Sequence, residues 1–110
     1  RKSKLKVYGP EGVQLLTDGT ELAYTNDYIF RNEHHGDLLA PLDVVGFDTH
    51  TVDLKNPILI DEDNLKITAY SVSHDPVEPA LGYRIDYKGR SMSISGDTTY
   101  DHNLVKNSKM

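Results

Sequence analysis

The second half of the chain limits the fold most, because apolar residues there recur with a period of two. Alternation of this kind predicts half-buried β-strands. Segments rich in Gly, Asn and Asp separate the strands and are typical of tight turns, at 61–64 and at 88–90. The predicted strands cover residues 49–54, 58–61, 65–72, 81–87 and 91–95. A run of short strands with compact turns predicts a mostly antiparallel sheet.

The first half follows a different pattern. A short strand at 5–8 is halted by Gly9-Pro10, and one or two helical turns are expected at 11–18. Partial helical spacing predicts a longer helix, with Gly36 as its stop and a loop after it. That helix covers 21–33, the loop covers 37–47, and a last helix begins at 101–109. The expected class is therefore α/β, in the layered α+β sense, with helices flanking the sheet.

Composition narrows the chemistry. The chain has 110 residues, a net charge of −5 and no cysteine. The length allows one domain at most and suits a piece of one. Without cysteine, a metal site must use His and carboxylate ligands. The acidic balance argues against a broad basic surface for nucleic acid. No apolar run approaches the roughly 20 residues of a membrane span, so we expect no membrane partner and a cytoplasmic protein.

Two residues stand out as candidates for a site. Asp97 follows Gly96 directly after a predicted strand, and His74 ends another strand where a Pro-containing loop begins. Strand ends and the loops after them often carry functional groups. The other histidines have simpler explanations. His34 and His35 suit the end of a helix, whereas His50 on a strand and His102 on the last helix are expected to face solvent.

Four short motifs occur in order along nearly the whole chain: Tyr8-Gly9-Pro10-x-Gly12, His74-x2-Val77-x2-Ala80-x-Gly82-Tyr83-Arg84, Lys88-Gly89-Arg90-Ser91 and Ser95-Gly96-Asp97-Thr98. Together they resemble the metallo-β-lactamase-fold hydrolases, in the branch that holds ribonuclease Z and the arylsulfatase-like hydrolases. The resemblance implies an αββα sandwich, of which residues 1–110 would form a single partial domain from the middle portion.

The resemblance implies roles for both candidate residues. Asp97 would bridge two zinc ions, which would activate a shared water for attack on an ester. His74 matches no metal ligand of the family and is expected to line the cleft or support a ligand. Tyr83 and Arg84 are expected to be structural or to lie near the pocket.

Two departures from the family pattern limit the expectation. The His-x-His-x-Asp-His metal motif and the later His ligands are absent, so the chain should be an inactive internal fragment by itself. The long RNA-gripping arm of many ribonuclease Z proteins is replaced by residues 85–87. Three functions therefore stay open: cleavage of phosphodiesters, with RNA as one candidate substrate; an arylsulfatase-like or other small-ester hydrolase; and a non-catalytic structural or binding fragment. The remainder of a parent chain, or an oligomer partner, would complete the sheet.

Overall fold

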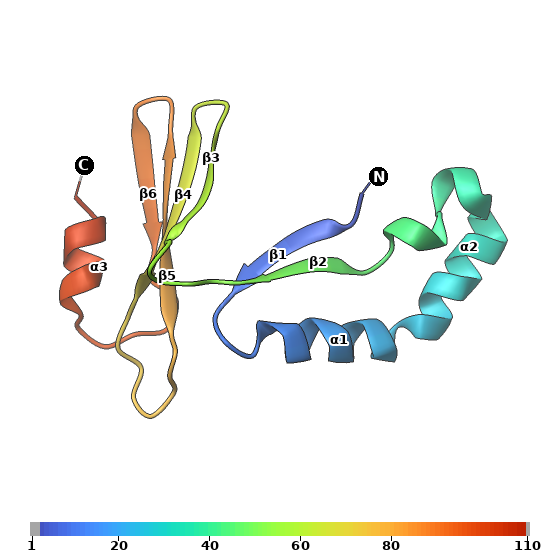
Figure 1. Cartoon of the computed structure of the whole chain (residues 1–110), viewed down its shortest axis with the longest axis horizontal. Coiled ribbons are helices and arrows are strands. Elements are labelled where there is room, and N and C mark those ends of the chain that lie inside the picture. The colour runs from blue at the N-terminus through green and yellow to red at the C-terminus, as the bar shows by residue number, and fades with distance from the viewer. Residues whose placement is uncertain (1–2, 110) are drawn as a thin grey trace. The chain divides into compact units, whose positions relative to one another are not determined.

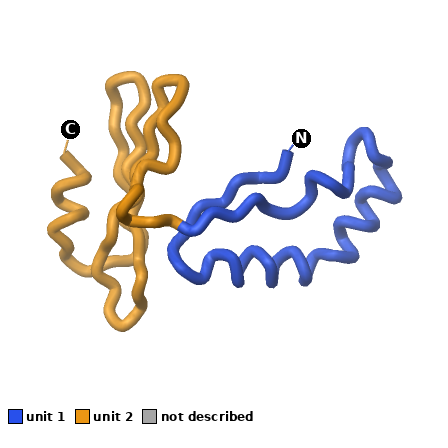
Figure 2. The backbone as a smooth tube through the Cα atoms, in the orientation of Figure 1, with its two compact units in different colours: residues 1–51 blue, residues 52–110 orange. Residues whose placement is uncertain are grey.

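The computed structural model describes residues 3–109 and divides into two compact units, the first ending at Thr51 and the second beginning at Val52 (Figure 2). Each unit contains its own sheet. Whether both belong to one partial domain, as the sequence suggests, stays a prediction. Within residues 3–109, no helix has the length and apolar character required to cross a membrane.

Unit 1 pairs two parallel strands, with a helix against one face (Figure 1). Val13 and Thr17 on that helix are buried, and the Thr17 hydroxyl lies 2.7 Å from the hydroxyl of Thr49 on the second strand. The elements are β1 (Leu5–Gly9), α1 (Val13–Ala23), α2 (Thr25–Leu39), the 3-10 helix η1 (Leu42–Val44) and β2 (Phe47–Thr51).

The helices of unit 1 differ from the expectation. The predicted helix at 21–33 is divided, because α1 ends at Ala23 and α2 begins at Thr25. The Thr25 hydroxyl donates to the carbonyls of Glu21 and Leu22, and such back-bonding bends helices. Gly36 does interrupt the helical geometry, with φ 76°, but helical hydrogen bonding continues to Leu39. The expected loop at 37–47 therefore contains the end of α2 and all of η1.

Unit 2 is a four-stranded antiparallel sheet in the order β3-β4-β5-β6, with one short helix. Both predicted turns are two-residue hairpins, at Asp63-Asn64 and Lys88-Gly89, and all four residues have positive φ, as a type I′ turn requires. The elements are β3 (Ile58–Glu62), β4 (Leu65–Ser71), β5 (Leu81–Tyr87), β6 (Arg90–Ile94) and α3 (His102–Asn107). The α/β class and the antiparallel sheet are confirmed, except that the strand predicted at 49–54 corresponds to β2, which pairs in parallel with β1.

The buried apolar residues of unit 2 are on and just after the central strand β4. Ala69, Tyr70 and Val72 are each less than 9% exposed. The Tyr70 hydroxyl lies 2.6 Å from the hydroxyl of Ser93 on β6, so the ring spans β5 beneath Gly82. Many large apolar side chains elsewhere remain exposed, including Leu22 at 78% and Leu38 at 93%.

Candidate functional site

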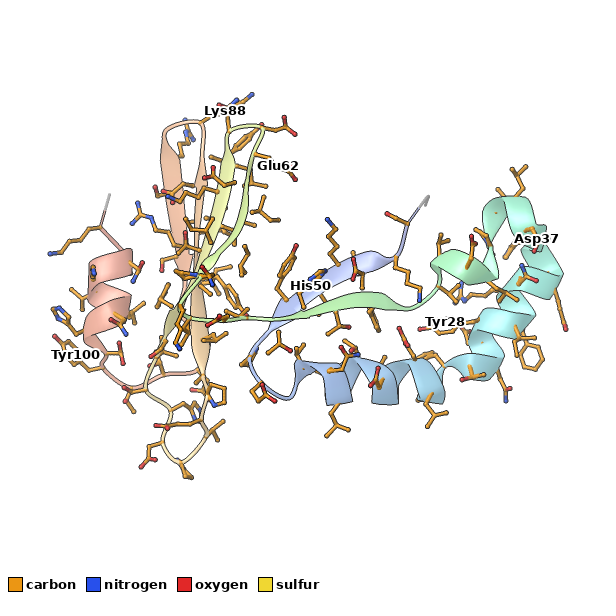
Figure 3. All side chains as sticks on the ribbon, in the orientation of Figure 1. Tyr28, Asp37, His50, Glu62, Lys88 and Tyr100 are labelled. Carbon is orange, nitrogen blue, oxygen red and sulfur yellow. The ribbon has the colours of Figure 1, made fainter. Side chains whose placement is uncertain are left out.

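The two candidate residues lie at the same end of the unit 2 sheet. Strand β4 ends opposite the start of β5, where Ser71 pairs with Leu81, and β6 ends beside the same part of β5, where Ile94 pairs with Tyr83. His74 follows the first of these ends and Asp97 follows the second. The hairpin turns are at the other end of the sheet, where Figure 3 shows Lys88 and Glu62.

His74 and Asp97 are in direct contact. His74 Nε2 lies 2.7 Å from Asp97 Oδ2, and the two side chains are 31% and 90% exposed. The hydrogen bond to Asp97 is the largest cause of a raised pKa of His74; a backbone hydrogen bond and then the charge of Asp97 add to it. His74 Nδ1 is buried and has no hydrogen-bond partner among the described residues. The imidazole therefore holds one carboxylate oxygen and leaves most of the Asp97 side chain exposed.

Gly96 is required by the turn that presents Asp97. Its φ is 64°, in the left-handed region that other residues rarely adopt. A Cβ at this position would also lie 3.0 Å from the carbonyl oxygen of Leu81. The Gly-Asp pair of the sequence thus marks a conformational need, because any other residue would be strained at this φ and would crowd the Leu81 carbonyl.

The loop after Asp97 is fixed to the end of β4 through Ser73, which the sequence reasoning missed. The Ser73 carbonyl accepts hydrogen bonds from the Thr98 hydroxyl at 3.0 Å and the Thr99 amide at 2.9 Å. The Ser73 hydroxyl donates to Asp101 at 2.6 Å, and that bond is the largest cause of the lowered pKa of Asp101. Only its place beside His74 could have singled out Ser73 in the sequence.

Arg84 of the Gly-Tyr-Arg motif has a structural role. Its guanidinium donates to the Asp86 carboxylate at 3.1 Å and to the Ser91 hydroxyl and the Asn107 carbonyl at 3.0 Å. The hydrogen bond from Arg84 is the first cause that lowers the pKa of Asp86, and one from Ser91 is the second. Tyr83 is half-buried, and burial raises its pKa. Arg84 therefore joins β5 and β6 to the end of α3.

The other four histidines are all exposed. His34 and His35 are exposed on α2, with their rings 4.6 Å apart edge to face. His50 is exposed on β2, as expected, and stacks on Tyr8 with the ring centroids 4.9 Å apart. Its Nε2 also lies 3.1 Å from Asp48. His102 is exposed at the start of α3.

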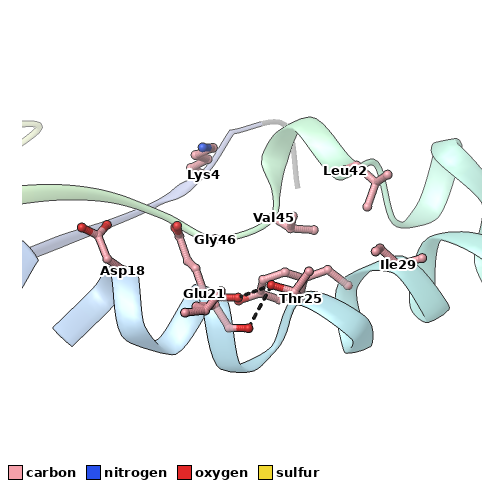
Figure 4. Close-up of a pocket in the computed structure, with 10 residues that line it drawn as sticks. Lys4, Asp18, Glu21, Thr25, Ile29, Leu42, Val45 and Gly46 are labelled. Atoms are coloured by element: carbon pink, nitrogen blue, oxygen red, sulfur yellow. Dashed lines mark hydrogen bonds between the residues drawn. The ribbon is translucent and has the colours of Figure 1, made fainter. Parts of the chain in front are cut away.

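Unit 1 contains a pocket of about 460 Å³, formed by α1, the start of α2 and the segment before β2 (Figure 4). Apolar side chains from both helices line the pocket. The charged residues Lys4, Asp18 and Glu21 also line it. The Glu21 carboxylate accepts a hydrogen bond from the Phe47 amide at 2.6 Å, so this acid serves the start of β2. The pocket contains neither candidate residue.

The donor types suit part of a zinc site. Asp97 supplies a carboxylate, and its Oδ1 has no hydrogen-bond partner within residues 3–109. Oxygen and imidazole nitrogen are zinc's usual ligands in a protein without cysteine. Among residues 3–109, however, no group of three His, Asp or Glu side chains is arranged to hold a metal. Asp97 fits as one ligand, and further ligands would have to come from outside these residues.

Comparison with known proteins shows a consistent relationship, although no family model matches the chain. It is 37% identical over 94 residues to "Ribonuclease Z" of Mycobacterium avium and 33% identical over 96 residues to that of Mycobacterium marinum. "Putative ribonuclease Z" of Mycobacterium tuberculosis is 32% identical over 94 residues. Each alignment covers 86% of this chain but only 32 to 40% of the relative.

The chain therefore spans about a third of the length of the curated relatives it matches. The chain contains helices and an antiparallel sheet, as the α/β class requires, and the relationship to ribonuclease Z implies the metallo-β-lactamase fold. The similarity along 86% of the chain is consistent with part of a ribonuclease Z-like protein of that fold.

Proposed function

We propose that the protein to which this chain belongs is a zinc-dependent hydrolase that cleaves phosphodiester bonds in RNA, with Asp97 as a ligand shared by two zinc ions. The main support is the similarity to proteins named ribonuclease Z, which extends along 86% of the chain. The geometry adds that Asp97 stands 90% exposed after a glycine turn at a strand end.

Asp97, His74 and Ser73 have different roles in this proposal. Asp97 would supply its carboxylate to the metal pair, and His74 Nε2, which lies 2.7 Å from Asp97 Oδ2, would limit the rotation of that carboxylate. A zinc pair, when bound, lowers the pKa of a shared water and so supplies hydroxide at neutral pH. His74 is accordingly a residue that supports a ligand, as the sequence indicated, and Ser73 holds the loop that carries Asp97.

The comparisons favour RNA over the other substrates. The three relatives described above all carry the ribonuclease Z name, and none supports an arylsulfatase-like enzyme or a non-catalytic fragment. The β5–β6 turn has two residues, so this chain has no long arm at that position. We propose that other parts of the protein supply most contacts to RNA. A cytoplasmic location remains a prediction that cell fractionation of the full-length protein would test.

Asp97→Ala in the full-length protein tests the metal role. Because a bridging carboxylate contacts both ions, we expect bound zinc, measured by mass spectrometry after dialysis, to fall by at least about half. Hydrolysis of bis-p-nitrophenyl phosphate should fall with it, whereas p-nitrophenyl sulfate should be a poor substrate throughout. Asp27→Ala is the matched control, since Asp27 is a partly exposed acid whose ion pair among residues 3–109 is with Arg31 on α2. Full zinc content in Asp97→Ala would refute the ligand role.

A further inference from the structure

We infer that Ser73 is the positioning residue that holds Asp97 in place, an inference that rests on the proposed function. The strand-end loop 96–101 has no regular secondary structure of its own. Without anchors, an exposed loop of this kind would sample many conformations, and Asp97 would meet His74 only part of the time. The anchors found in the structure converge on a single residue of another strand end.

The main chain of Ser73 forms the first anchor. Its carbonyl oxygen accepts from the Thr98 hydroxyl at 3.0 Å, the Thr99 amide at 2.9 Å and the Thr99 hydroxyl at 3.3 Å. These donors directly follow Asp97 in the chain. They bring the loop to the residue that immediately precedes His74, and this proximity sets up the 2.7 Å contact between the two side chains.

The side chain of Ser73 forms the second anchor, at the far end of the loop. Its hydroxyl donates to Asp101 Oδ2 at 2.6 Å, while Asp101 Oδ1 accepts from the Asn103 amide at 2.7 Å as the N-cap of α3. Asp101 therefore ties the helix start to Ser73. The Asn103 side chain adds a bond to the carbonyl of Ser71 at 3.1 Å. The segment 97–101 is thus held at both ends against β4.

Ser73 is itself exposed, and its hydrogen bonds go to residues that follow Asp97 rather than to Asp97 itself. Its effect on the site must therefore pass through the loop. Groups that bond directly to a metal ligand typically change metal affinity by about 10-fold to 100-fold when removed, and Ser73 acts one step further out. Loss of the Ser73 hydroxyl bond alone, with the bonds to the Ser73 carbonyl left intact, should therefore give the lower end of that range.

The test uses the full-length protein and two pairs of substitutions. Ser73→Ala removes the hydroxyl that bonds to Asp101, and Ser73→Thr keeps a hydroxyl at the same position. Thr98→Val removes one of the donors to the Ser73 carbonyl, and Thr98→Ser retains that donor. Ser108→Ala is the control, because it removes a hydroxyl bond of 2.7 Å on α3 that does not involve the loop.

Two measurements are made on each variant. Zinc affinity is obtained by competition with a chelator, and hydrogen exchange of the peptide covering 96–101 is followed in the metal-free protein. We expect Ser73→Ala and Thr98→Val each to weaken zinc binding about tenfold and to speed exchange of this peptide. Ser73→Thr and Thr98→Ser should restore both values, and Ser108→Ala should alter neither.

The outcomes separate this inference from the proposed function. If Asp97→Ala removes zinc but Ser73→Ala and Thr98→Val leave zinc affinity unchanged, the positioning role is wrong and the proposed function stands. If Asp97→Ala keeps its zinc, the proposed function fails and with it the link from Ser73 to a metal. In that case hydrogen exchange still tests whether Ser73 anchors the loop. Unchanged exchange of the 96–101 peptide in Ser73→Ala would refute the anchoring role as well.

Discussion

Gly82 shows how a single absent side chain controls the packing of the sheet. A Cβ at this position would lie 2.5 Å from ring carbons of Tyr70, closer than any real carbon contact. Tyr70 is 5% exposed, and its hydroxyl is bonded to Ser93. The ring therefore cannot move aside without losing that bond or opening the core.

We expect Gly82→Ala to destabilise the full-length protein by about 1–3 kcal/mol, the usual cost of overpacking a buried site. Thermal denaturation followed by circular dichroism would measure the shift. Gly19→Ala is an instructive control, because Gly19 is inside α1 with open space around its Cβ position. That change should be neutral or stabilising, so an equal loss of stability in both variants would contradict the packing argument.

Individual side chains carried enough information to predict His74 and Asp97 as parts of one site. Each is a reactive residue type placed where a strand ends, and the structure brings them into contact. Ser73 could not be predicted in the same way. Most of its hydrogen bonds use the main-chain carbonyl, a group that every residue possesses. Its importance depends on which donors the fold brings near, and this is tertiary information.

At the scale of elements, α3 is a short helix that other elements hold at both ends. Asp101 caps its start, and Arg84 on β5 donates to the Asn107 carbonyl at its end, where a cation also complements the helix dipole. A helix of six residues is too short to be stable alone. Its attachment to the sheet therefore depends on these contacts.

Arg84→Lys should loosen α3 while preserving the charge. A lysine ammonium cannot reproduce the planar fork that reaches Asp86, Ser91 and Asn107 together. We expect a loss of about 1–2 kcal/mol in stability and faster hydrogen exchange over residues 102–107. Arg90→Lys, at the exposed first position of β6, is the control. Similar effects from the two substitutions would contradict the role of Arg84 in holding α3 to the sheet.

The elements that sequence predicted best are those set by local chemistry. Both hairpin turns contain residue types that accept positive φ, and the predicted strands of unit 2 agree closely with the structure. The break between α1 and α2 was not predicted, because Thr25 is an ordinary helix residue until its hydroxyl bonds back to Glu21 and Leu22. The parallel pairing of β1 with β2 depends on contacts between distant segments.

At the scale of the whole molecule, exposed apolar side chains are the most conspicuous feature. They occur in both units, on α1, on α2 and on β6, where Met92 is 55% exposed. Parallel strands such as β1 and β2 are ordinarily covered on both faces. We propose that the remainder of the parent protein covers these surfaces and completes the sheets, as the sequence led us to expect.

This proposal predicts a difference between two preparations. The isolated 110-residue chain should enhance the fluorescence of an apolar dye such as ANS several-fold more per mole than the full-length protein, because it leaves apolar faces in water. Chain concentration is varied in parallel to detect self-association, which would identify an oligomer partner instead. Equally low fluorescence from both proteins, with the isolated chain monomeric, would contradict the proposal.

The long connection between β1 and β2 affects how the chain assembles. Leu5 pairs with Phe47 across about forty positions, whereas each hairpin of unit 2 closes through two turn residues. On simple chain-entropy scaling, the longer closure is less favourable by roughly 2–3 kcal/mol before any helix forms within it. Helices α1 and α2 shorten the gap as they form. By this scaling, helix formation within the connection favours the strand pairing of unit 1, whereas each hairpin of unit 2 joins neighbours in sequence.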